Sequence, residues 1–307
     1  MSLGTFDVLI IGGGPGGYSA ALYCARAGLK TLVVEKLSAG GQMALAGTLD
    51  NYPGYDEGID GFELGERMKK GAERFGAETV NEEVVSVDLA ATPKRVTTNR
   101  GDYLARTVVI ATGATHKELG LPEEKRLVGR GVAYCATCDG ARFKGKRVVV
   151  VGGGNSAVTD ALTLAALCEH VTLVHRRDTL SATQVYFSQI ENAGNITFIG
   201  TSDVIAIEHS KKVTGVTVRS SVTGETTYIP CDGLFIAIGR RPATELFTGQ
   251  VEMDENGYII AGETTETSIP GVFAVGDVRT KPARQVITAA ADGAVAAKSA
   301  EGYLRTL

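Results

Sequence analysis

The chain has 307 residues, 44% of them hydrophobic and 21% charged, with a formal net charge of −4. That length exceeds one ordinary hydrophobic core, so we expect two domains. The weak negative charge argues against a general nucleic-acid binder, which normally shows a basic face. No apolar stretch reaches a membrane-spanning length, no basic and apolar leader precedes the first strand, and five cysteines are too few for a secreted disulfide framework. We therefore expect a cytoplasmic protein with no nucleic-acid or membrane partner.

A nucleotide-binding pattern opens the chain. The apolar run at 6–11 predicts a buried parallel strand, and Gly12-Gly13-Gly14-Pro15-Gly16-Gly17 follows it and satisfies GxGxxG. A helical segment at 18–27 leads to a second strand at 31–34, which ends in Glu35. An acid at that spacing after the glycines hydrogen-bonds a ribose, so the unit predicts a dinucleotide site. The alternative is a tight strand-to-helix turn without a ligand.

The same pattern returns in the middle of the chain with one change. A strand at 147–151, the GxGxxA motif of 152–157, a helix at 157–168 and a strand at 171–174 repeat the first unit. The position that held Glu35 now holds His175, followed by Arg176 and Arg177. Replacing the acid with cations suits a ribose that carries a 2′-phosphate. The alternative is that Arg176 and Arg177 are an ordinary solvated strand end.

The other apolar runs extend this duplication. Strands are expected at 84–87, 95–98 and 108–111 in the first half, mirrored at 204–207, 213–218 and 234–238, with a helix at 61–75. The polar, turn-rich segment 116–130 is the best candidate for a domain linker. Further strands are expected at 257–260 and 271–275, before an alanine-rich helix that starts near Arg284 and runs to about Leu304. We expect this tail to complete the first domain, which makes the second domain an insertion.

Between the two glycine motifs lies the pentapeptide Cys135-Ala136-Thr137-Cys138-Asp139. Two cysteines three positions apart can close a disulfide, bind a metal or serve redox chemistry. A zinc site needs about four ligands, whereas the other three cysteines and the four histidines are scattered, so we expect no metal. Cys24 and Cys168 lie in the two helices that follow the glycine motifs and are expected to be small buried residues.

Together these motifs resemble the low-molecular-weight thioredoxin reductase family of pyridine nucleotide-disulfide oxidoreductases, over essentially the whole chain. The resemblance implies an α/β fold of two Rossmann-like three-layer (ββα) domains, the second inserted into the first. Residues 1–115 and 246–307 would form the FAD-binding domain, and 116–245 the NADPH-binding domain that carries the dithiol. It also implies a homodimer, a large domain rotation, and thioredoxin or a similar small dithiol protein as the partner.

The resemblance further assigns residues. Those that would bind FAD are Gly12, Gly14, Pro15, Gly17, Glu35, Lys36, Gly41, Gln42, Asn51, Val84, Val85, Thr112, Gly113, Gly276, Asp277, Arg284, Gln285 and Val286. Those that would bind NADPH are Gly152, Gly154, Asn155, Ser156, His175, Arg176, Arg177, Ile238 and Gly239. Cys138 would face the flavin, Cys135 would attack the partner's disulfide, and Asp139 would be the acid–base group.

The sequence departs from the family pattern at two places. Ser181 stands where the family usually has a third phosphate-binding arginine, which predicts weaker discrimination between NADPH and NADH. Ala141 and Arg142 stand where known members carry two aromatic residues that help to dock thioredoxin. A donor such as NADH or ferredoxin, a different small dithiol partner and a non-enzymatic redox sensor are therefore the competing interpretations.

Overall fold

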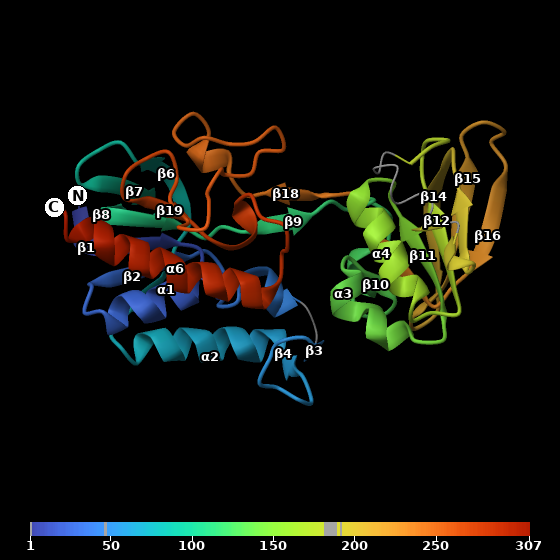
Figure 1. Ribbon diagram of the computed structural model, residues 1–307, viewed down its shortest axis with the longest axis horizontal. Helices are drawn as coiled ribbons and strands as arrows, with labels where there is room; N and C mark the ends of the chain where they lie inside the picture. The colour runs from blue at the N-terminus through green and yellow to red at the C-terminus, as the bar shows by residue number, and fades with distance from the viewer. Residues whose placement is uncertain (1, 46–47, 181–188, 191) are drawn as a thin grey trace. The chain divides into compact units, whose positions relative to one another are not determined.

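The computed structural model describes residues 2–45, 48–180, 189–190 and 192–307. The chain forms two compact units, Met1–Thr115 with Arg241–Leu307 and His116–Arg240, so that the second is inserted into the first (Figure 1). The return boundary lies five residues before the 245/246 position expected from the sequence. Residues 241–245 belong to the first unit because they are bonded into it: Ala243 donates its N–H to the Gly113 carbonyl at 3.0 Å and accepts from Thr112 Oγ1 at 2.7 Å.

A seven-stranded sheet forms the centre of the first unit, in the order β5-β2-β1-β8-β7-β6 with β19 also paired to β8. Strands β1, β2, β5, β8 and β19 run parallel, whereas β6 and β7 are antiparallel to their neighbours. Their bounds are β1 Ser2–Ile11, β2 Thr31–Glu35, β5 Glu78–Asn81, β6 Val84–Asp88, β7 Lys94–Thr98, β8 Asp102–Ile110 and β19 Val272–Ala274. The pairing of β19 with β8 confirms that the C-terminal tail completes this unit.

Alternate residues of the strands face two different layers, as the period of two requires. Val8 and Ile10 of β1 pack against α1 (Pro15–Arg26) and α6 (Val286–Leu304), which together with α2 (Gly61–Glu73) form the helical layer. Leu9 and Ile11 pack on the opposite face with residues that include Val96 of β7. These faces of the unit are visible in Figure 1, where α1, α2 and α6 lie on one side of the sheet.

Short elements fill the loops of the first unit. They are η1 Gly41–Leu45, β3 Thr48–Leu49, β4 Ile59–Asp60, η4 Glu245–Phe247 and η5 Gly276–Val278. Asp60 caps α2, since its Oδ1 accepts the N–H groups of Phe62 and Glu63, each at 3.0 Å. β3 pairs with β4, and Met43 and Leu49 pack with Ile59 and Leu64.

The second unit repeats the three layers. A parallel sheet in the order β10-β17-β11-β12-β13 lies between α4 (Asn155–Ala165) and an antiparallel sheet β14-β15-β16. Val148 and Val150 of β11 face α4, whereas Val149 and Val151 face the antiparallel sheet. The remaining bounds are η2 Lys125–Leu127, β10 Val132–Ala133, α3 Ala136–Asp139, η3 Gly140–Phe143, β11 Arg147–Val151, β12 His170–Val174, β13 Ile196–Ile199, β14 Ser202–His209, β15 Val213–Ser220, β16 Thr226–Pro230 and β17 Gly233–Ile236. Both units therefore have the predicted Rossmann-like, three-layer α/β architecture.

Two predictions about segments were wrong. Residues 116–130 are not a linker, because Leu127 is buried and Leu119 and Leu121 pack on the core of the second unit. Residues 257–260 do not form a strand, since Ile259 makes only isolated bridges, to Met253 and to Arg279. Both predictions relied on the local composition of the segment, whereas its structure depends on contacts with residues that are distant in the sequence.

The two chain crossings between the units form a small sheet of β9 (Ala114–His116) with β18 (Arg240–Pro242). Among the described residues, no helix is both long and apolar enough to cross a membrane.

Candidate redox and nucleotide sites

The carboxyl ends of the first unit's parallel strands gather the residues predicted to bind a dinucleotide. β1 is followed by Gly12, β2 ends at Glu35, β8 is followed by Thr112 and Gly113, and β19 is followed closely by Gly276. Strands β2, β1, β8 and β19 are neighbours and parallel, so these ends share one edge. Ligands of open α/β sheets bind at that edge.

Two of the glycines in the first motif have no room for a side chain, whereas a third faces open space. A Cβ on Gly12 would lie 2.5 Å from the Ala111 carbonyl oxygen, and one on Gly17 would lie 2.0 Å from the Gly12 oxygen. Gly14 differs, since a Cβ there would meet no atom within 4 Å. Gly14 is also the N-cap of α1, with Pro15 as the first helical residue, so no N-cap side chain occupies the first-turn N–H groups. This open helix N-terminus suits a pyrophosphate.

Glu35 is held by the glycine loop itself. Its Oε2 accepts the Gly13 N–H at 2.6 Å and its Oε1 accepts the Leu37 N–H at 2.9 Å. A carboxylate has about four acceptor positions, so it retains capacity for the hydroxyl groups of a ribose.

Residues far apart in the sequence join at the same site. Asn51 Nδ2 donates to Gln285 Oε1 at 3.1 Å, which connects the loop after β3 to the N-cap of α6. Gln285 also forms a capping box with Thr288. The Gly276 N–H donates to Oδ2 of the buried Asp292 at 2.9 Å, which fixes the turn that carries Asp277.

The remaining residues predicted for FAD lie on the same unit with varied surroundings. Gly41 and Gln42 begin η1, and Val286 begins α6 and packs on the small cluster around Met43. Lys36 makes an exposed ion pair with Glu83 at 2.7 Å, and Val84 and Val85 start β6. The Arg284 guanidinium lies 4.1 Å from the Tyr258 ring centroid, while its buried Nε has no hydrogen-bond partner among the described residues.

The second unit shows the equivalent edge with different chemistry. Gly152 follows β11, Gly154 is the N-cap of α4, and Asn155 and Ser156 are exposed in its first turn. A Cβ on Gly153 would lie 2.4 Å from the His175 ring, so the imidazole packs against Gly153 as the Glu35 carboxylate contacts Gly13. Ile238 and Gly239 follow β17 at the same edge. The structure thus confirms that His175 occupies the position of Glu35 in the repeat.

Two arginines, Arg176 and Arg177, are close enough to His175 to affect its charge. Burial lowers the pKa of His175, and the neighbouring Arg176 and Arg177 lower it further. Both arginines are exposed, and His175 Nε2 is buried without a hydrogen-bond partner in the described part of the chain. A neutral imidazole beside two exposed guanidinium groups is suited to an anionic ligand. Ser181 lies outside the described residues.

The dithiol is closed and sits at the start of a short helix. Cys135 and Cys138 form a disulfide with a Cα–Cα distance of 5.3 Å, and Cys135 is the N-cap of α3. The Cys138 N–H donates to Cys135 Sγ at 3.2 Å. Asp139 Oδ1 lies 3.6 Å from the Arg142 guanidinium. Cys24, Cys168 and Cys231 are buried free thiols, which confirms the expectation for Cys24 and Cys168.

An aromatic and carboxylate network precedes the disulfide. The Tyr134 ring stacks on His116, with centroids 4.8 Å apart, and its hydroxyl donates to Glu124 Oε1 at 2.8 Å. Glu124 is buried and also accepts the N–H groups of Leu119, Gly120 and Leu121 at 2.9–3.2 Å. Burial lowers the pKa of His116 to about 4, aided by Arg240, so this imidazole is neutral near pH 7. The segment before Cys135 is therefore held by polar contacts that sequence reasoning missed.

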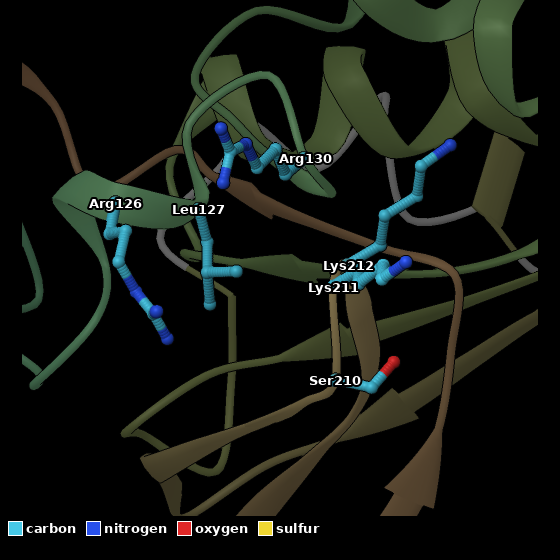
Figure 2. Close-up of a pocket in the computed structure, with 6 residues that line it drawn as sticks. All are labelled: Arg126, Leu127, Arg130, Ser210, Lys211 and Lys212. Carbon is cyan, nitrogen blue, oxygen red and sulfur yellow. The ribbon is translucent and has the colours of Figure 1, made fainter.

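A basic surface cavity lies elsewhere on the second unit. Figure 2 shows its lining, which comes from the η2 region and from the turn between β14 and β15. The cavity has a volume of about 390 Å³ and is lined by Arg126, Leu127, Arg130, Ser210, Lys211 and Lys212. None of these is a predicted site residue.

Comparison with known proteins agrees with this arrangement. The pyridine nucleotide-disulphide oxidoreductase family model matches residues 6–293. The chain is 47% identical to a thioredoxin reductase of Streptomyces clavuligerus, covering 98% of this chain and 94% of that protein. It is 45% identical to a thioredoxin reductase of Treponema pallidum, covering 98% of each. The crystal structure of thioredoxin reductase from Streptococcus pyogenes matches with a TM-score of 0.93 and 40% identity over 99% of both chains.

The fold and the redox disulfide thus define a class, and the chain belongs to the pyridine nucleotide-disulphide oxidoreductase family. That family implies a flavin and a nicotinamide cofactor. Within it, the three relatives named above are thioredoxin reductases, and the chain is of the low-molecular-weight type that the sequence motifs indicated.

The sequence motifs also did not identify Asp160, a partly buried acid on α4. Burial raises its pKa to about 6. The sequence contained a signal for this residue, because Ala157, Ala161 and Leu164 share its helical face and are apolar.

Proposed function

We propose that the protein is an FAD-dependent thioredoxin reductase that takes electrons from NADPH and delivers them through Cys135 and Cys138. The observation that carries this proposal is the closed Cys135–Cys138 disulfide in a unit that also has a cation-rich nucleotide edge. A dithiol beside a nucleotide site is what electron transfer to a protein disulfide needs.

The first unit suits FAD. Gly14 leaves open space at the start of α1, and Glu35 stands where it can accept from ribose hydroxyl groups. Asn51, Asp277 and Gln285 would hold the rest of the cofactor, with the other residues predicted for this site around them. When bound and reduced, a flavin supplies a pair of electrons to a disulfide.

The second unit suits NADPH. Gly152 and Gly154 would admit the pyrophosphate to the start of α4, and Arg176 and Arg177 would bind the 2′-phosphate. The missing third arginine at Ser181 should narrow the preference for NADPH over NADH without reversing it.

Local geometry favours Cys135 as the attacking sulfur. Once the disulfide is reduced, the Cys138 N–H that points at Cys135 Sγ would stabilise a Cys135 thiolate. That thiolate would attack one sulfur of the oxidised partner, releasing a partner thiolate and forming a mixed disulfide. Cys138 would then attack Cys135 Sγ, restoring the intramolecular disulfide and releasing the second partner thiolate. The two released thiolates take up two protons, one of which Asp139 would deliver.

The surface beside the dithiol bears on the choice of partner. Ala141 and Arg142 are exposed, and Arg142 lies beside Asp139 instead of presenting an aromatic side chain. We therefore propose a thioredoxin, or a similar small dithiol protein, with a surface that complements a cation at this place.

We further propose a homodimer. Apolar side chains exposed on the first unit, such as Tyr23 at 47% and Phe62 at 49%, are the kind that a subunit interface covers. Light scattering on the purified protein tests this: a mass of one chain at micromolar concentration would contradict it.

The proposed activity is tested with Cys135→Ser and Cys138→Ser. Wild type should oxidise NADPH when oxidised thioredoxin is added, and both variants should lose that turnover because neither can re-form the disulfide. Cys138→Ser should still capture a single-cysteine thioredoxin, activated as a mixed disulfide, whereas Cys135→Ser should not. Turnover with no dependence on either cysteine would overturn the proposal.

A further inference from the structure

The end of β17 runs directly beside the glycine loop of the second unit. The Ala237 N–H donates to the Val151 carbonyl at 2.8 Å, and a Cβ on Gly152 would lie 2.4 Å from the Ala237 carbonyl oxygen. In the sheet order β10-β17-β11-β12-β13, β17 lies on one side of β11 and β12 on the other. A dinucleotide crosses such a sheet where the strand order reverses, which here is between β17 and β11. One half of the ligand should therefore pass the end of β17.

Lys117 places a cation at that end of β17. Its backbone N–H donates to the Gly239 carbonyl at 3.0 Å. Gly239 has a φ of 108°, and a Cβ there would lie 3.8 Å from Lys117 Nζ, so the lysine side chain lies against the glycine. Gly239 is among the residues expected to bind NADPH, whereas neither the motifs nor the family resemblance pointed to Lys117.

The ammonium group of Lys117 is free to meet a ligand. The residue is exposed, and its side chain makes no hydrogen bond or ion pair within the described part of the chain. The neighbouring acid Glu118 has another partner, since its Oε2 lies 3.3 Å from Lys125 Nζ. Arg240 is also near, because it adds to the lowering of the His116 pKa that burial causes. This end of the sheet is therefore cationic and suits a phosphate group.

The two halves of a dinucleotide would meet different cations on the two sides of β11. Arg176 and Arg177 follow β12, on the side of the adenosine half, and Lys117 lies on the side of the nicotinamide half. We propose that Lys117 binds the nicotinamide-side phosphate of the dinucleotide and so contributes equally to the binding of NADPH and NADH. The inference rests on the proposed function, because it needs a nicotinamide dinucleotide as the donor.

The experiment measures binding to the oxidised full chain by isothermal titration calorimetry, so it requires no turnover. Lys117→Met removes the charge and keeps most of the length of the side chain, whereas Lys117→Arg keeps the charge. Lys212→Met changes an exposed lysine in the turn between β14 and β15 and is the matched control. The probes are NADP+, NAD+, 2′-phospho-ADP-ribose and 2′,5′-ADP, the last of which lacks the nicotinamide-side phosphate.

In Lys117→Met, the Kd values for NADP+ and NAD+ should each rise about tenfold, because a charge-assisted hydrogen bond to phosphate is lost. The Kd for 2′-phospho-ADP-ribose should rise by the same factor, since this probe has both phosphates and no nicotinamide ring. The Kd for 2′,5′-ADP should stay at the wild-type value. Lys117→Arg and Lys212→Met should both resemble wild type.

The double variant Arg176→Ala/Arg177→Ala should show the reverse pattern. It should bind NADP+ and 2′,5′-ADP more weakly and leave the Kd for NAD+ nearly unchanged, because only the first two probes carry a 2′-phosphate. Opposite patterns in the two variants would show that each end of the sheet binds its own phosphate.

Two results would overturn the inference. One is a Lys117→Met variant that binds NADP+ and NAD+ as tightly as wild type does. The other is an equal loss for 2′,5′-ADP, which would indicate a general disturbance of the nucleotide site. Failure of the proposed function looks different: a wild type that binds neither NADP+ nor NAD+ would have another donor, and the inference would fall with the function.

Discussion

At the scale of single residues, the two nucleotide edges differ by one matched pair of contacts. Glu35 accepts the N–H of Gly13, while the His175 ring packs against Gly153, the equivalent residue of the second motif. The first arrangement offers a carboxylate to a ribose, and the second offers an imidazole with Arg176 and Arg177 beside it. The chemistry of each edge thus follows from one position at the end of a strand.

This contrast predicts the donor preference. Replacing both Arg176 and Arg177 with alanine should lower kcat/KM for NADPH by about 100-fold, since a hydrogen bond to a charged group contributes ~1.5–3 kcal/mol. The value for NADH, which has no 2′-phosphate, should change far less. Steady-state kinetics with both donors measure the two constants.

Arg219→Ala is the matched control, because Arg219 is an exposed arginine on β15 of the same unit. An equal loss for NADH and NADPH in the double variant would show that the arginines do not recognise the 2′-phosphate.

The spacing of residues in the sequence was enough to identify Glu35 and His175, but it did not predict which residues contact each other across the fold. The spacing after each glycine motif identified Glu35 and His175, because the βαβ unit has a nearly fixed length. The stacking of Tyr134 on His116 and the hydrogen bond from its hydroxyl to Glu124 join separate segments. Such contacts depend on tertiary packing, which no local pattern encodes.

At the scale of elements, α6 is tied to the turn after β19 by a buried charge network. Asp292 on α6 accepts from Gly276 at 2.9 Å, from Arg279 Nε at 3.1 Å and from Lys281 Nζ at 2.7 Å. The Arg279 and Lys281 side chains are only 10% and 5% exposed. The network positions the Gly276–Asp277 turn and gives two buried cations one shared anionic partner.

Asp292→Ala should therefore destabilise the protein by about 3 kcal/mol, because removing one partner leaves buried charge uncompensated. Urea unfolding followed by circular dichroism measures this loss, and the purified variant should retain less flavin. Glu301→Gln, near the C-terminal end of the same helix, should change the unfolding midpoint far less, because its ion-pair partners Lys298 and Arg305 are exposed to solvent. If Asp292→Ala unfolds at the wild-type urea concentration, the network is not a stabilising element.

Most elements, though not all of their limits, could be predicted from the sequence. Hydrophobic periodicity located α1, α4 and the core strands, yet α1 begins at Pro15 and α4 at Asn155, before the first residues expected to be helical. The start of each helix is hard to predict because its N-cap is a glycine, which has no capping side chain to mark the position. The prediction of a strand at 257–260 was wrong because a strand-like composition forms a strand only where a neighbouring strand can pair with it.

At the scale of the whole molecule, the second unit is inserted at a point where the chain leaves and re-enters along paired strands. β9 and β18 are hydrogen-bonded, with the Lys117 N–H donating to the Gly239 carbonyl and Ala243 to Gly113, each at 3.0 Å. Residues 115 and 241, where the first unit breaks off and resumes, therefore lie close together. Insertions of a domain are usually tolerated at such points.

Replacing residues 116–240 with a short Gly-Ser linker should leave the first unit folded and able to bind flavin. The purified product should show a flavin absorbance spectrum and a cooperative unfolding transition, but no disulfide reductase activity. An insoluble or flavin-free product, when the intact protein binds flavin, would show that the first unit depends on the insertion for folding.

The insertion itself was predictable from the sequence, because the internal repeat marks where one nucleotide-binding pattern interrupts another. The return of the tail to pair β19 with β8 followed from the need to complete the first sheet. The return boundary was placed five residues late, since the backbone bonds of Ala243 to Gly113 have no signature in composition.

We expect electrons from NADPH to reach Cys135 and Cys138 and no other cysteine. The most direct measurement adds NADPH anaerobically to the flavin-loaded protein, alkylates the thiols that appear and maps them by peptide mass spectrometry. Burial raises the pKa of Cys24 and Cys231 to about 12 and of Cys168 to about 11, so these thiols should stay unlabelled. Cys135 and Cys138 should both be labelled, and their labelling should depend on NADPH. If NADPH is consumed while both of these cysteines stay unlabelled, the proposed electron path is wrong.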